Sequence, residues 1–316
     1  MTISNANTAL TVVTPAETPS LSFDLPELTV GIAEYPEGPT GCTVLRFARA
    51  LRTAVDVRGG WVGMTQAFTV CDAICLTGGS LIGLESVYGV MAGILAEREY
   101  SLAQGNPVVN GAVIYDYRFR ANTIHPDMAL GRAALDAART GAFPLGSRGA
   151  GRSASVGKVY DYSRAESGGQ GAAYRQIRDV QLAVFTVVNA LGVIVDRAGQ
   201  VVRGNLDPST GRRSDFAHEA ATLTYDSASR STVPENTTLT VVVTNQKLDD
   251  FSLGQLGRQV HGSMARAIQP FHTARDGDVL YAVTTDEVDG LPLTSLGILA
   301  GELAWDAVLS AVEHAT

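Results

Sequence analysis

One stretch near the end of the chain limits its possible folds more than any other. It is the run TTLTVVVTN (237–245), in which nearly every residue is β-branched and none is charged. Such a run favours a buried, central strand. An amphipathic helix follows, with one apolar face made by Leu253, Leu256, Val260, Met264 and Ile268. A second strand, DVLYAVTT, and a terminal helix carrying Leu296, Leu299, Leu303 and Trp305 complete the pattern. The last 80 residues therefore predict strand, helix, strand, helix.

The earlier part of the chain repeats these two kinds of element. The runs LTVGIAEY, CTVLRFA and RTAVDV predict strands, as do residues 112–115, 182–188 and 193–196. Residues 80–98 and 128–140 predict helices. The first residues, 1–22, are rich in Thr, Ser, Asn and Pro and predict a mobile leader. Without internal repeats, we expect one α+β domain with sheets packed between helix layers.

Composition excludes several classes of protein. Of the 316 residues, 45% are hydrophobic and 18% are charged, which excludes a disordered chain. A net charge of −8 opposes a nucleic-acid partner. Three cysteines lack any disulfide spacing, no basic residue precedes Arg46, and no uninterrupted apolar run approaches ~18 residues. We therefore expect a cytoplasmic protein without a membrane partner.

No motif in the sequence has the spacing that a metal site or a cofactor site requires. GAGRSASVGKV resembles a phosphate-binding loop, but five residues separate Gly151 from Gly157, and Val159 follows the lysine. The spacing of Cys71 and Cys75 favours two buried thiols. His261 and His272 are predicted to be structural. The sequence predicts neither a metal nor a cofactor.

The junction between Asn236 and Thr237 is a candidate site of catalysis. Polar, turn-forming residues end at Asn236, and the apolar strand begins at Thr237. A threonine at a strand edge is an ordinary β-former. Alternatively, its hydroxyl attacks the preceding carbonyl and breaks the chain, and the freed α-amine, which titrates near ~8, then serves as a base. Spacing alone does not choose between these interpretations.

A resemblance to a known family, spread over many segments in the same order, favours the second interpretation. NTTLTVVVTN and HGSMARAIQPFHTARDGDVLYAVTTDEVD are the longest; the others are YPEGPTGCTVLRF, RTAVDVRGG, NGAVIYDY, GRAALDAA, GAGRSASVGK, GQGAAYR, LGVIVDRAGQVVRGN and LAWDAVL. Together they resemble the self-cleaving 6-aminohexanoate-oligomer hydrolases. These belong to the L-aminopeptidase/D-esterase and β-peptidyl aminopeptidase family of N-terminal nucleophile hydrolases.

The resemblance implies a set of site residues. Thr237 matches the nucleophile released by cleavage after Asn236. Lys158 matches a lysine that polarises oxygen or holds charge, and Asn189 matches an oxyanion donor. As simpler alternatives, Lys158 is a solvated surface residue and Asn189 a turn residue.

The remaining implied residues are acidic or aromatic. Tyr115 matches a tyrosine that faces the substrate pocket, and is otherwise a half-buried strand residue. Asp276 and Asp278 match residues that contact the nucleophile and its amine, and otherwise form an Asp-Gly turn. Glu235 stands where we expect a small residue, which would alter the cleavage rate.

The resemblance also implies a fold and an activity. The fold is an αββα four-layer sandwich over residues 23–316, cleaved into 23–236 with its leader and 237–316. The activity is cleavage of internal amide bonds in 6-aminohexanoate oligomers through an acyl-Thr237 ester, by a homotetramer of processed protomers without metal or cofactor. Two alternatives stay open: an aminopeptidase of the same family, and an uncleaved, non-catalytic binding protein.

Overall fold

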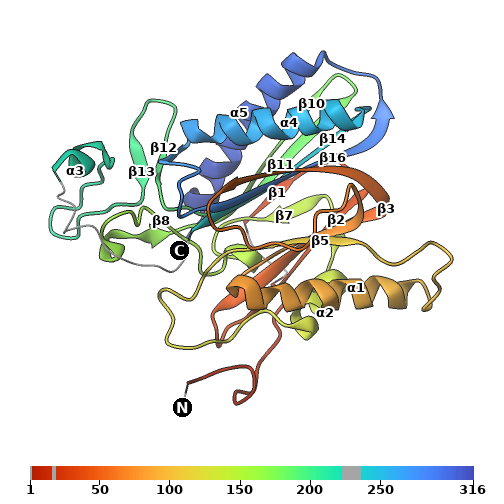
Figure 1. Cartoon of the computed structure of the whole chain (residues 1–316), viewed down its shortest axis with the longest axis horizontal. Coiled ribbons are helices and arrows are strands. Elements are labelled where there is room, and N and C mark those ends of the chain that lie inside the picture. Colours follow the sequence, from red (N-terminus) through yellow and green to blue (C-terminus); the bar gives the residue numbers. More distant parts are fainter. Residues whose placement is uncertain (1, 16–18, 223–235) are drawn as a thin grey trace.

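The computed structural model describes residues 2–15, 19–222 and 236–316 (Figure 1). Its helices are α1 (Glu85–Glu97), α2 (Met128–Asp136), α3 (Ala217–Thr222), α4 (Asp250–Ser263) and α5 (Leu293–Glu313). Its strands are β1 (Ser20–Ser22), β2 (Leu28–Tyr35), β3 (Thr40–Gly59), β4 (Val70–Thr77), β5 (Val109–Val113), β6 (Arg139–Thr140), β7 (Ala142–Pro144), β8 (Ser155–Val156), β9 (Glu166–Ser167), β10 (Gly169–Ile177), β11 (Val180–Asn189), β12 (Val193–Val195), β13 (Val201–Arg203), β14 (Thr237–Gln246), β15 (Ile268–Gln269) and β16 (Gly277–Val288).

The long strand β3 joins two halves of one sheet. Among the described residues the strand order is β10-β11-β14-β16-β3-β2-β6, and off this path β4 pairs with β3 and β5 pairs with β4. Residues 52–59 of β3 pair with β16, and residues 40–47 pair with β2. The prediction of two separate strands here was wrong, because no glycine or proline interrupts residues 42–58.

Three apolar clusters separate four layers, which confirms the predicted αββα sandwich. Figure 1 shows α4 and α5 on one side of the strands and α1 and α2 on the other. Phe47, Phe185 and Tyr281 lie in the central cluster between the two halves of the sheet. Leu253 and Leu296 pack with Val242 and Leu280 beneath α4 and α5, and Val90 and Leu130 pack with Val44 beneath α1 and α2.

Side chains along β14 alternate between the two faces of the sheet, which fixes the directions of Thr237 and Thr238. Leu239 and Val241 belong to the central cluster, whereas Val242 belongs to the cluster under α4 and α5. Because successive strand residues point to opposite faces, Thr237 shares the face of Leu239, and Thr238 points toward the helices.

Two helical stretches, Ser80–Glu97 and Leu293–Glu313, are long and apolar enough to cross a membrane by length and composition alone. Neither stretch is an uninterrupted apolar run, because Glu85 lies in the first and Glu302 and Asp306 in the second. In α5 more than half of that stretch is buried, including Leu296, Ala300 and Ala304. The helix contacts β10, β11 and α4, so its apolar character covers a sheet in this fold.

Part of the leader packs on the domain. Val13 exchanges backbone hydrogen bonds with Glu34, and β1 pairs with β7. The Asn5 side chain donates to the carbonyl of His125 at 3.0 Å. Because of these contacts, described residues before Phe23 are part of the folded domain, although the leader was expected to be mobile.

Candidate active site

Three strand ends meet at one edge of the sheet. Asn189, the last residue of β11, pairs in register with Thr237, the first residue of β14. The parallel neighbour β16 begins at Gly277 beside them. All three residues are buried, so the start of β14 lies inside the protein.

The peptide bond between Asn236 and Thr237 is held by two donors. Thr237 Oγ1 donates to the Asn236 carbonyl oxygen at 2.5 Å, and the Gly277 N–H donates to the same oxygen at 2.9 Å. A side chain on Gly277 would meet the Trp61 carbonyl oxygen at 1.9 Å, so only glycine lets the strand approach this closely. The Gly277 N–H stabilises the negative charge that develops on this oxygen during nucleophilic attack, while the Thr237 hydroxyl lies next to the carbonyl group that it would attack.

Lys158 is buried, with only 1% of its surface exposed, so the surface-residue alternative is wrong. Its Nζ donates to Asn189 Oδ1 at 2.8 Å and to Ser155 Oγ at 2.9 Å. Gly157 positions it with a φ of +74°, where a Cβ would meet the Asn205 nitrogen at 2.3 Å. The Gly-rich segment therefore aims a lysine into the sheet edge.

The Asn189 amide joins several parts of the site. Its Oδ1 accepts from the Ser155 N–H at 3.0 Å as well as from Lys158. Its Nδ2 donates to the Tyr115 carbonyl at 3.0 Å. Asn189 ends a buried strand, so the turn-residue alternative is wrong.

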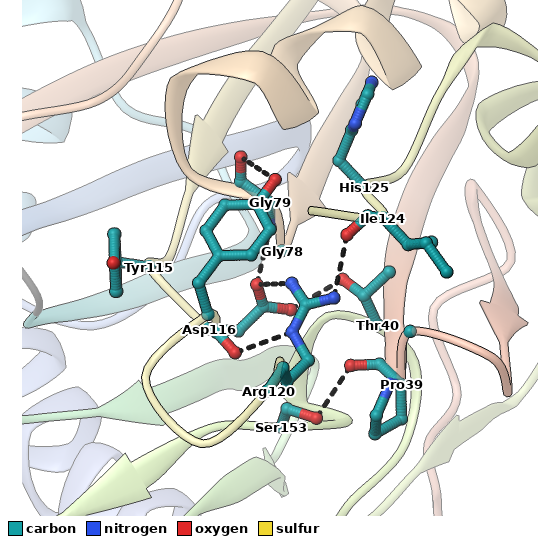
Figure 2. Close-up of polar contacts among 12 residues, drawn as sticks. Pro39, Thr40, Gly78, Gly79, Tyr115, Asp116, Arg120, Ile124, His125 and Ser153 are labelled. Carbon is teal, nitrogen blue, oxygen red and sulfur yellow. Dashed lines mark hydrogen bonds and ion pairs between the residues drawn. The ribbon is translucent and has the colours of Figure 1, made fainter. Parts of the chain in front are cut away.

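Tyr115 lies just after β5 and lines a pocket that also contacts Asn236 and Thr237. The following residue anchors its loop: the Asp116 carboxylate pairs with Arg120 at 2.5 Å and accepts from Thr40 Oγ1 at 2.6 Å. Figure 2 shows this cluster, with the Tyr115 ring directed away from it. Both charged side chains are almost completely buried, so the pair fixes the loop that presents Tyr115.

The two aspartates have different partners. Asp278 Oδ1 accepts from the Thr238 N–H at 2.7 Å, one residue beyond the expected nucleophile. Asp276 Oδ2 accepts from the N–H and the hydroxyl of Thr273, at 2.8 and 2.6 Å, and no described contact joins this carboxylate to Thr237. The structure thus brings Asp278 to the start of β14, whereas the Asp276 side chain holds a turn.

Burial governs the ionisation of both aspartates. It raises the pKa of Asp276 to about 6, and the negative charge of Asp278 adds to this shift. Burial also raises the pKa of Asp278, against the effect of a hydrogen bond from His272. Two buried carboxyl groups whose pKa values are raised above the ordinary range are suited to accept and return protons.

Three further residues belong to the site and were missed. The Gly277 N–H and the Ser155 hydroxyl gave no sequence signal, since backbone donors and lone serines have none. His272, expected to be only structural, donates from Nδ1 to Asp278 Oδ2 at 2.9 Å. Its position six residues before Asp278 is the signal that was available.

Several other predictions concern residues around the site. His261 is structural as expected: it is buried in α4 and bonded to Asp56. The three cysteines are free and buried. In 2–15, 19–222 and 236–316 no group of three His, Cys, Asp or Glu is placed to hold a metal. Glu235 lies outside the described residues.

Comparison with solved structures identifies the fold. The L-aminopeptidase D-Ala-esterase/amidase of Ochrobactrum anthropi, a variant of the Ntn hydrolase fold, matches with a TM-score of 0.66 and 16% identity. The match covers 96% of this chain and 89% of the other. The chain therefore has the fold of the N-terminal nucleophile hydrolases.

Sequence comparison then gives the family. The 6-aminohexanoate-oligomer endohydrolase of Agromyces sp. strain KY5R is 46% identical over 304 residues, 92% of this chain and 85% of the relative. The enzyme of the same name from Kocuria sp. strain KY2 is 46% identical over 307 residues, 93% and 86% of the two chains. The model of Peptidase family S58 matches residues 22–316, and the chain belongs to this family. The predicted class, an amide hydrolase, is confirmed.

Proposed function

We propose that this chain is a self-processing amide hydrolase that cleaves internal amide bonds of 6-aminohexanoate oligomers through an ester on Thr237. The observation that carries this proposal is the Asn236 carbonyl oxygen, held by both the Thr237 hydroxyl and the Gly277 N–H. The substrate is taken from the relatives that are 46% identical.

Maturation uses the chain as its own first substrate. Thr237 Oγ attacks the carbonyl carbon of Asn236, the C–N bond breaks, and the hydroxyl proton ends on the released nitrogen. Water then hydrolyses the ester, leaving a carboxylate on Asn236 and a free amine and hydroxyl on Thr237. The Gly277 N–H stabilises the oxyanion in both steps.

Substrate hydrolysis repeats this chemistry with the mature Thr237. Its α-amine, which titrates near ~8, accepts the hydroxyl proton as Oγ attacks the substrate carbonyl, and passes it to the leaving amine. Water hydrolyses the acyl ester and restores the hydroxyl. Asn189 pairs with Thr237 across β11 and β14, and Lys158 donates to its amide oxygen, so the two residues supply an amide group and positive potential near the oxyanion.

The exo-acting aminopeptidase is the second candidate, since an aminopeptidase shares the fold. A ladder of linear 6-aminohexanoate oligomers discriminates between the two activities. Internal cuts yield mixed oligomers from the first minutes, whereas an aminopeptidase releases monomers one at a time from the amine end.

Intact mass with N-terminal sequencing tests the processing step. The smaller fragment is expected to begin TTLTVVV, from residue 237. A single uncleaved chain that hydrolyses the oligomers would overturn the mechanism. We also propose that the processed protein is a homotetramer, which size-exclusion chromatography with light scattering tests. The free, buried cysteines support a cytoplasmic location, which cell fractionation tests.

A further inference from the structure

A narrow apolar pocket opens beside the Asn236–Thr237 bond. Its volume is about 100 Å3. Among the described residues that line it none is charged, and the walls are mostly apolar: Trp61, Val62, Leu81, Val113 and Tyr115. Asn236 and Thr237 border it at the reacting bond.

The uncleaved chain shows which half of a substrate lies here. Asn236 is the acyl side of the bond that Thr237 attacks, and it borders this pocket. Within the described part of the chain, the buried Asn236 Oδ1 accepts no hydrogen bond. An unpaired amide oxygen fits such a pocket poorly, whereas an apolar chain meets matching walls.

We propose that this pocket is the acyl subsite and that it selects an unbranched run of methylene groups next to the scissile carbonyl. This inference rests on the proposed function and adds its specificity determinant. Each buried methylene strengthens binding about fourfold. The five methylenes of a 6-aminohexanoyl group therefore favour it over the three of a 4-aminobutanoyl group by about fifteenfold.

Gly63 controls the width of the pocket. A Cβ on Gly63 would meet Val113 Cγ2 at 2.5 Å and Leu81 Cδ2 at 3.2 Å, so it would enter the space between these two walls. Val113 is buried and β-branched and cannot turn aside easily. Gly63→Ala is therefore expected to shorten the acyl chain that the pocket accepts.

The experiment compares two anilides that share p-nitroaniline as leaving group, 6-aminohexanoyl and 4-aminobutanoyl. In the wild type the ratio of kcat/KM is expected to be about fifteen, and Gly63→Ala is expected to bring it near one. Leu81→Ala, at a side chain that is 63% exposed and dispensable for the core, is expected to lower the ratio partway. Gly262→Ala, whose Cβ meets nothing within 4 Å, is the matched control and should keep the wild-type ratio.

A second measurement does not depend on turnover. Trp61 and Trp305 are the only tryptophans, so in Trp305→Phe the fluorescence reports Trp61 alone. Hexanamide is expected to change this fluorescence at about fifteenfold lower concentration than butanamide, and Gly63→Ala should remove the difference. Failure to hydrolyse both the linear 6-aminohexanoate oligomers and the anilides would refute the proposed function but leave this titration decisive. Equal titration by both amides, or an unchanged anilide ratio in Gly63→Ala and Leu81→Ala, would refute the acyl subsite.

Discussion

Two neighbouring threonines allow a one-atom test of the nucleophile. Thr237→Val and Thr238→Val each replace a hydroxyl by a methyl group of similar shape, at consecutive buried positions. Thr237 donates to the carbonyl that it is proposed to attack. Thr238 points to the other face of the strand, and its buried hydroxyl has no partner among the described residues.

The two variants should therefore behave in opposite ways. Thr237→Val is expected to remain one chain of 33.2 kDa and to lose amide hydrolysis by a factor of about 10⁶, the cost of removing a nucleophile. Thr238→Val should split normally into fragments of about 25 and 8 kDa, in proportion to residues 1–236 and 237–316. Thr237→Ser keeps the oxygen but loses the methyl that restricts χ1, so slower cleavage should survive.

The free energy of unfolding provides a second quantitative test. In the uncleaved Thr237→Val background, adding Thr238→Val removes a buried hydroxyl without a partner, which should raise the free energy of unfolding by about 1 kcal/mol. Urea denaturation measures this difference on an intact chain. Denaturing gels over several days and product release from 6-aminohexanoate oligomers measure the chemistry. Fragments or turnover in Thr237→Val would refute the reasoning, and cleavage lost only in Thr238→Val would place the nucleophile one residue later.

Three other predictions follow from the site. Lys158→Met should lower turnover about 10²- to 10³-fold in the anilide assay, whereas the exposed Lys247, the only other lysine, should tolerate the same change; equal activities would exclude Lys158. Because burial raises the pKa of Asp276 to about 6, its protonated form stabilises the fold, and this contribution is lost as pH rises from about 4 to 6. In uncleaved Thr237→Val protein, adding Asp276→Asn should remove that loss in urea titrations at pH 4.5 and 7, and an unchanged difference would contradict the shift. Asp116→Leu leaves the Arg120 guanidinium buried without its carboxylate, so it should cost about 3–5 kcal/mol in urea denaturation; a loss below 1 kcal/mol would contradict the anchoring of the Tyr115 loop.

Local patterns in the sequence determined the elements around the site. The β-branched run predicted a strand from Thr237, and β14 begins there. The apolar spacing predicted the helix face of α4, in which Leu253, Leu256 and Val260 are all buried. These features were readable because side-chain direction repeats every two residues in a strand and every 3.6 in a helix. The order of these elements predicted an α+β domain, whereas the αββα sandwich and the family were implied by the resemblance of many sequence segments to a known family.

The tertiary structure decided which ends of these elements meet. The pairing of Asn189 with Thr237 joins residues 48 positions apart, and the Gly277 N–H reaches the Asn236 carbonyl from 41 positions away. Local propensity contains no information on such pairings, because they depend on the register of strands distant in sequence. Lys158 looked like a solvated residue among glycines, but it is buried next to Gly157, whose φ is positive, and it donates to Asn189 and Ser155. The chemistry therefore depends on long-range pairing, whereas the strands and helices that carry it follow from the local sequence.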